Sequence, residues 1–266
     1  MDNWIDLKKN NYINKTDCND LCAILIEESD SLNAKSMDNI ISWLKTCYAN
    51  PDDVNEAIQL QMFETEADFF RTKFPTDLNI KSGDFGEAIA HYIMEKHPNL
   101  NFKVPVFKLR YKRNPNKSSF GSDIKGFKYK EEHGIDAICT GEIKSGITKK
   151  YTVIQDACFQ LINEFARDKE IEQIARIAHD LQQGKNNEFK KLIRFFKDDS
   201  FSREFIFIGL FDIEHNIKRM FEIISEPKKI KNKPVKTLSF KAVQDNITFY
   251  ILPIKDYRDK LVKAYE

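Results

Sequence analysis

Cysteine is scarce and scattered in this sequence. The chain of 266 residues has an odd number of cysteines, without the paired spacing of a zinc cluster and without a secretory leader ahead of them. We therefore expect reduced thiols in a cytoplasmic protein, and we exclude a disulfide-stabilised secreted domain. The five cysteines are Cys18, Cys22, Cys47, Cys139 and Cys158.

Long apolar runs are also missing. The longest run, FIFIGLF at residues 205–211, has the length of a buried strand and is far too short to cross a bilayer. We expect a soluble protein with no membrane partner. A chain of this length buries roughly three quarters of its unfolded surface, which is enough for one large core or for one core with a smaller appended region.

An excess of charge of one sign is absent overall but present locally. The net charge is +1, yet residues 1–70 hold 5 Lys and Arg against 14 Asp and Glu, a net of −9. Residues 101–150 hold 12 Lys and Arg against 5 Asp and Glu, a net of +7. A local basic zone is what binding to a phosphate backbone requires, although two ordinary solvated faces would give the same pattern.

The acidic first part of the chain has apolar residues at helical spacing. The pattern predicts helices over residues 20–28, 37–48 and 54–70. We interpret residues 1–78 as an acidic helical region that docks a partner or inhibits the rest of the chain. Residues 79–266 would then form the main core, beginning with a helix over GDFGEAIAHYIMEKH.

The pattern changes to an alternation of period two at Asn101. Apolar and basic residues alternate in FKVPVFKLRYK, and shorter strands are predicted at residues 124–129 and 135–144, giving three antiparallel strands in succession. The predicted fold class is α/β, with a mixed sheet flanked by helices. The remaining predicted elements are helices over 152–165, 169–182 and 187–197, strands over 205–212, 217–224 and 248–253, and a short final helix.

The GEIKSG motif is the most distinctive local feature. Glu142 and Lys144 lie two apart on a predicted strand and therefore share one face, whereas Ile143 points the other way. A carboxylate and an amine fixed side by side can hold a hard cation and a water next to each other. Taken alone, such a pair is more often a simple ion pair on an edge strand.

Asp123 strengthens the case for a site. It stands at the start of the strand that pairs with the Glu142 strand, so the two carboxylates come together. Magnesium takes one or two protein carboxylates together with water and phosphate oxygens, and without a cation two close carboxylates would repel. Asp136 is a competing ligand with the same strand parity as Glu142, but it would lie roughly 20 Å away along a straight strand.

Three other groups are candidates for the site. Glu87 lies on the preceding helix, opposite Phe85 and one turn from His91, and either points toward the metal or belongs to a solvated face. Gln155 either positions substrate or is a surface glutamine. A basic face, joined by Tyr111, would follow a DNA backbone or simply block edge pairing; its members are Lys108, Arg110, Lys112, Arg113 and Lys117.

Three motifs occur in one order: GDFGEA, then KLRYKRNPNKSSFGSD, then GEIKSG. Over roughly residues 80–170 the chain resembles the nuclease subunit of the Hachiman anti-phage defence system, the HamA family. The resemblance implies a restriction-endonuclease-like core of the PD-(D/E)xK superfamily, with Asp123, Glu142 and Lys144 as catalytic positions and Glu87 as a looser one. It also implies a superfamily-2 helicase partner. Ser122 stands where the superfamily motif has proline.

The expected function is magnesium-dependent hydrolysis of DNA phosphodiester bonds. Asp123 and Glu142 would bind one or two Mg²⁺ ions, with Mn²⁺ as a substitute, and Lys144 would orient the attacking water or offset transition-state charge. Two other classes of function stay open. The chain would be either a catalytically silent DNA-binding subunit with this fold or an interaction module whose acidic region docks on the helicase.

Overall fold

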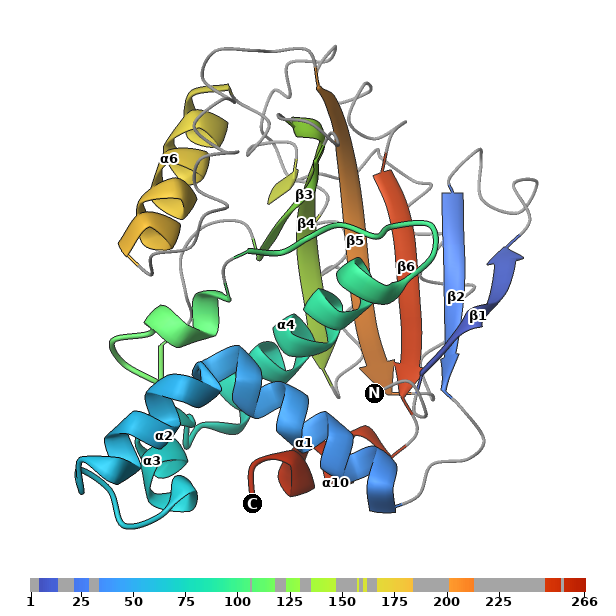
Figure 1. The fold of residues 1–266 in the computed structure, drawn as a ribbon. Coiled ribbons are helices and arrows are strands. Elements are labelled where there is room, and N and C mark those ends of the chain that lie inside the picture. The colour runs from blue at the N-terminus through green and yellow to red at the C-terminus, as the bar shows by residue number, and fades with distance from the viewer. Residues whose placement is uncertain are drawn as a thin grey trace, which may run out of the picture.

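A mixed sheet with helices on both faces is the architecture of this chain in a computed structural model (Figure 1). The sheet has six strands in the order β1-β2-β6-β5-β4-β3, which confirms the predicted α/β class. These are β1 (Ile5–Ile13), β2 (Cys22–Glu28), β3 (Ile124–Tyr129), β4 (Ile135–Gly146), β5 (Ser202–Asp212) and β6 (Ile247–Ile254). The structure describes residues 5–13, 22–28, 34–105, 107–117, 123–129, 135–146, 157, 160–161, 167–183, 201–212, 247–254 and 256–266.

Strands β4, β5, β6 and β2 run parallel to one another, whereas β3 at one edge and β1 at the other are antiparallel to the strand beside them. The apolar run that was predicted to be a buried strand is β5, and its residues from Phe205 to Phe211 are all buried. A parallel strand covered on both faces has this continuous apolar pattern.

Helices cover the two faces of β4 differently. On one face, α1 (Ala34–Tyr48), α4 (Leu78–Lys96) and α10 (Tyr257–Ala264) share a core with Ala137, Cys139 and Ile143. On the other face, α6 (Arg167–Gln183) packs over Ile138. In Figure 1, α4 crosses in front of the sheet while α1 and α10 lie beyond its end. Because side chains alternate along a strand, the Glu142 side chain lies on the same face of β4 as Ile138.

The helix predicted over residues 20–28 is wrong. Residues Cys22–Glu28 form β2, which pairs with both β1 and β6. The run CAILI is short and continuously apolar, and periodicity alone does not distinguish a buried strand from a buried helix in such a run. Two strands of the sheet therefore come from the acidic first part of the chain.

The single helix predicted over residues 54–70 is also wrong, because the segment folds as α2 (Pro51–Gln59) and α3 (Glu66–Lys73). Gln61 between them has a φ of 57°, a left-handed conformation that ends the first helix. The Thr65 side chain accepts a hydrogen bond from the Asp68 backbone and begins the second. The proposed boundary at residue 78 falls on the first residue of α4, and the docking or inhibitory role of residues 1–78 stays a prediction.

The basic segment is not the predicted strand. Lys103 forms one isolated bridge with Phe127, and residues Lys108–Tyr111 then form a 3-10 helix, η2. Pro105 has no N–H to donate, so the strand pairing cannot continue past it. The predicted face of alternating lysine and arginine side chains therefore does not exist, and each basic residue has its own surroundings.

Several predicted elements lie outside the described residues: the helix over 187–197, the strand over 217–224, and most of the helix over 152–165. Within the described part of the chain, no helix combines the length and apolar composition that crossing a membrane would take.

Candidate active site

The β3–β4 hairpin places Asp123 beside the Glu-x-Lys motif. Ile124 at the start of β3 pairs with Gly141, so Asp123 stands next to Glu142 across the ladder. Asp123 Oδ2 accepts a hydrogen bond from the Ile143 backbone nitrogen at 2.8 Å. The Asp123 carboxylate is therefore anchored between Glu142 and Lys144, just before β3 begins. Beyond Gly141, β4 continues without β3 beside it.

Glu142 and Lys144 form a close ion pair. Lys144 Nζ lies 2.6 Å from Glu142 Oε1, and the side chains are 23% and 4% exposed for the lysine and the glutamate. Lys144 Nζ also donates to Gln160 Oε1 at 3.1 Å. Gln155, the glutamine singled out in the sequence, lies outside the described residues, and nothing in the local sequence pattern distinguished Gln160.

Helix α4 lies against the end of β4 at very short range. A Cβ built on Gly86 would meet Ser145 Oγ at 2.6 Å, so a larger residue would push the helix and strand apart. Ser145 Oγ also donates to the Ser82 carbonyl at 2.6 Å. Gly86, the second glycine of the GDFGEA motif, thus allows α4 to lie close to the Glu-x-Lys strand.

A cavity of about 240 Å³ lies between α4 and β4. Asp84 and Glu87 line it from α4, and Asp123 and Lys144 line it from the sheet. Glu142 is not among the lining residues, but it forms an ion pair with Lys144, which is. Sequence reasoning missed Asp84, although its spacing from Glu87 puts both carboxylates on one side of a helix and was a usable signal.

Glu87 has a strongly perturbed pKa. Burial raises the pKa of Glu87 from 4.5 to about 8; Lys108 opposes this rise, whereas Asp123 adds to it. Asp123 adds to the rise because both carboxylates line the same cavity. Burial also raises the pKa of Asp84, although hydrogen bonds from Lys112 and Tyr48 lower it. Concentrated carboxylates of this kind are typical of functional sites.

The Glu87 carboxyl should give the protein a stability that depends on pH. The Glu87 carboxyl has an ordinary pKa of 4.5 and a folded pKa of about 8. At pH values between the two, the folded protein holds a proton that the unfolded chain releases. This stabilising contribution is complete below pH 4.5 and is lost as the pH rises through 8. Glu87→Gln has no such proton, so in EDTA its stability relative to wild type should rise between pH 5 and pH 8.5, by up to about 4 kcal/mol.

Thermal unfolding at pH 5 and pH 8.5 measures this effect, with the exposed Glu56→Gln as the control. His91, whose pKa burial lowers to about 3, is present in all three proteins. An equal difference in melting temperature between wild type and Glu87→Gln at both pH values would show that Glu87 is not titrating in this window.

The cavity offers oxygen donors. Of the described residues that line it, none is histidine or cysteine, and its carboxylates are ligands for a hard cation such as Mg²⁺ or Mn²⁺ and poor ones for a soft metal. No group of three or more histidine, cysteine or acidic side chains in the described part of the chain has the spacing of a metal cluster. The carboxylates that line the cavity fit magnesium, which typically takes one or two protein carboxylates and fills its other positions with water or phosphate oxygens.

The other predicted residues lie in distinct places. Asp136 is exposed near the start of β4, away from the cavity. Arg110 donates from Nε and Nη2 to the Thr46 carbonyl at 3.1 and 2.8 Å, which satisfies the C-terminal turn of α1. Lys108 is half-buried, whereas Arg113 and Lys117 are exposed.

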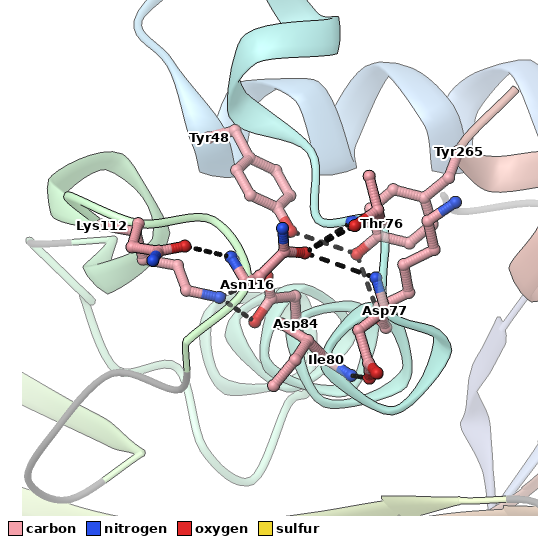
Figure 2. Close-up of polar contacts among 10 residues, drawn as sticks. Tyr48, Thr76, Asp77, Ile80, Asp84, Lys112, Asn116 and Tyr265 are labelled. Atoms are coloured by element: carbon pink, nitrogen blue, oxygen red, sulfur yellow. Dashed lines mark hydrogen bonds and ion pairs between the residues drawn. The ribbon is translucent and has the colours of Figure 1, made fainter.

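Lys112 is buried rather than available to DNA. Its Nζ lies 2.8 and 2.7 Å from the two carboxylate oxygens of Asp84, and the two side chains are 4% and 6% exposed. Figure 2 shows this pair together with Tyr48, which donates to the same carboxylate, and Tyr265, whose hydroxyl lies 3.3 Å from that of Tyr48. Lys112 therefore fixes one wall of the cavity.

Comparison with known proteins gives one clear result. The HamA family model matches residues 1–265, nearly the whole chain. No curated protein matches the sequence.

Proposed function

The chain belongs to the HamA family and is therefore a subunit of the Hachiman anti-phage defence system, and on that premise we propose that it is a metal-dependent deoxyribonuclease. The proposed reaction is hydrolysis of a DNA phosphodiester bond. The proposed core of the active site is Asp123, Glu142 and Lys144, with Glu87 in support.

One observation carries the proposal. The Asp123 carboxylate accepts the backbone N–H of the residue between Glu142 and Lys144, and Lys144 Nζ is 2.6 Å from Glu142. Two acidic residues and one amine therefore meet at a single strand end beside an acidic cavity. A simple surface ion pair would not require a second carboxylate there, because close carboxylates oppose each other's ionisation.

Asp123 and Glu142 are the residues that would hold the magnesium. When bound, such an ion polarises a phosphate and lowers the pKa of a coordinated water. The protein keeps the Asp123 carboxylate in place through the Ile143 hydrogen bond, so little reorganisation is needed on binding. Glu87, with its pKa of about 8, is able to exchange a proton near neutral pH.

Lys144 is the cationic member of the site. Its ammonium is held by Glu142 and Gln160 and lines the cavity, where it would orient a water or offset negative charge on the phosphorus-centred transition state. The Lys144 side chain is 23% exposed, so its amine is only partly screened by water and acts on developing charge more strongly than an amine in bulk water.

A superfamily-2 helicase is the proposed partner, as the defence-system membership suggests. The exposed acidic residues of α2, Asp52, Asp53 and Glu56, are a candidate docking surface. Deleting residues 1–78 would not test this idea, because β2 pairs with β6 and Trp43 of α1 donates to the Ala88 carbonyl of α4. Charge-reversing substitutions on α2 would leave the sheet intact.

The metal requirement tests the proposed reaction. Plasmid, linear and single-stranded DNA should be cut in Mg²⁺ or Mn²⁺, by the chain alone or with the helicase, and cutting should stop in EDTA while far-ultraviolet circular dichroism stays the same. Ca²⁺ serves as a control cation for binding without turnover. Cleavage that persists in EDTA, or a failure of every DNA to be cut in any of these mixtures, would contradict a metal-dependent deoxyribonuclease.

A further inference from the structure

The segment from Phe107 to Lys117 is anchored along its whole inner side. Phe107 stacks on the buried His91 ring with centroids 4.8 Å apart, and the Arg110 guanidinium lies 4.6 Å from the Phe107 ring. Leu109 is buried, and the Lys112 ion pair with Asp84 holds the middle of the segment on α4. An exposed loop with this many internal contacts is held in one conformation.

The far end of the segment is fixed by its Asn-Pro-Asn turn. The Asn114 side chain accepts from the Asn116 nitrogen at 2.9 Å, and the Lys117 nitrogen donates to the Asn114 carbonyl at 3.2 Å. Pro115 stands at the turn position that favours its fixed φ. Asn116 Oδ1 then accepts from the Thr76 nitrogen at 2.7 Å, just before α4 begins, as Figure 2 shows.

The outer side of the same segment carries an aromatic ring and two cations. Tyr111 is 54% exposed, one of the large hydrophobic side chains that the described part of the chain leaves exposed. Lys112 turns inward, whereas its neighbours Tyr111 and Arg113 are both exposed. The turn brings Lys117, also exposed, back to within about 7 Å of Asn114 at the Cα atoms.

From this arrangement we propose that the segment is a preformed binding site for single-stranded DNA. An unpaired base stacks on the Tyr111 ring, and Arg113 and Lys117 contact the phosphates that flank it. Arg110 and Lys112 act as positioning residues that hold the segment and do not touch the nucleic acid. The inference rests on the proposed deoxyribonuclease function and adds to it the strandedness of the substrate.

The chemistry favours an unpaired strand over a duplex. An exposed aromatic ring interacts with the face of a base, and that face is available only when the base is unstacked from its neighbours. Two cations alone would serve either form of DNA, because phosphate contacts carry no information about pairing. Asp84 joins this segment to the cavity, since it pairs with Lys112 and also lines the cavity. The segment and the proposed catalytic site are therefore joined through α4.

Fluorescence anisotropy with the full-length chain tests the proposal, using labelled oligodeoxythymidylate and a labelled DNA duplex at low salt in EDTA. Tyr111→Ala should weaken binding to the single strand by roughly five-fold or more and change duplex binding by less than about two-fold. Tyr111→Trp should retain single-strand binding. Met62→Ala, another exposed hydrophobic residue that lies on the α2–α3 connection, is the matched control.

Salt dependence tests the two cations separately. Arg113→Gln and Lys117→Gln should each reduce the slope of log affinity against log salt by about 0.7 on the single strand, whereas the exposed Arg258→Gln on α10 should not change it. Equal loss of single-strand and duplex binding in Tyr111→Ala would overturn the proposal, as would an unchanged single-strand affinity or no binding by wild type. Because cleavage is blocked in EDTA, these results are independent of whether the chain is a nuclease.

Discussion

Glu142→Gln should reduce DNA cleavage by a factor on the order of 10²–10⁴ while leaving the melting temperature within a few degrees of wild type. The substitution removes a charge that would hold the cation and keeps the size of the side chain, so the loss falls on the reaction rather than on the fold. Lys144→Gln should lose cleavage to a similar degree, because the amine faces the proposed reacting phosphate. Initial rates in Mg²⁺ and thermal unfolding of the same preparations measure both effects.

The two strands that flank β4 supply the matched controls. Lys128 and Glu204 form an ion pair at 3.4 Å, and the Glu204 side chain is 41% exposed. Glu204→Gln and Lys128→Gln should cleave at the wild-type rate, since neither residue lines the cavity. Their stability should change little, because exposed ion pairs contribute little to stability. If Glu142→Gln cleaves as fast as Glu204→Gln, the Glu142–Lys144 pair is structural and the assignment is wrong.

Lys112→Met should destabilise the fold by about 3–5 kcal/mol. The substitution leaves the Asp84 carboxylate buried without the ammonium that donates to both of its oxygens. An uncompensated charge in a poorly solvated place is costly, and the Tyr48 hydroxyl alone does not neutralise it. For a chain of this size the melting temperature should fall by roughly 6–20 °C, which differential scanning calorimetry resolves.

A double variant separates loss of charge balance from loss of packing. Adding Asp84→Asn to Lys112→Met removes the buried charge, so the double variant should recover much of the stability that the single variant loses. Lys117→Met, an exposed lysine on the same segment, should change stability by less than about 0.5 kcal/mol. A Lys112→Met protein as stable as Lys117→Met would show that the Asp84 pair does not stabilise the fold.

The parts of the fold that could be predicted are those specified by short-range sequence. Short strand patterns and turn signals predicted β3 and β4, and a continuous apolar run predicted β5. The spacing within GEIKSG predicted the shared face of Glu142 and Lys144. The hairpin connection was short enough to bring Asp123 beside Glu142. Each of these inferences needs only neighbouring residues or one hairpin, and no knowledge of how distant elements pack.

The features that could not be predicted depend on partners far along the chain. β2 is a strand because it adds to β6, more than 200 residues later, whereas its local apolar run fits a helix as well. Asp84 lines the site because Lys112, 28 residues away, holds it there. Arg110 and Lys112 looked like phosphate-binding residues because sequence shows their charge but not the carbonyl and carboxylate that bind them.

The most direct test of the site is a double-mutant cycle on cleavage with Asp123→Asn and Glu142→Gln. Asparagine keeps an oxygen that accepts a hydrogen bond from the Ile143 nitrogen, but it removes the charge. The substitution therefore separates the hydrogen bond that Asp123 makes to β4 from its proposed catalytic role. If both carboxylates serve one metal-dependent step, each single variant should lose most of the activity, and the double variant should lose little more. Wild-type cleavage by Asp123→Asn, or losses that multiply in the double variant, would contradict a shared catalytic site.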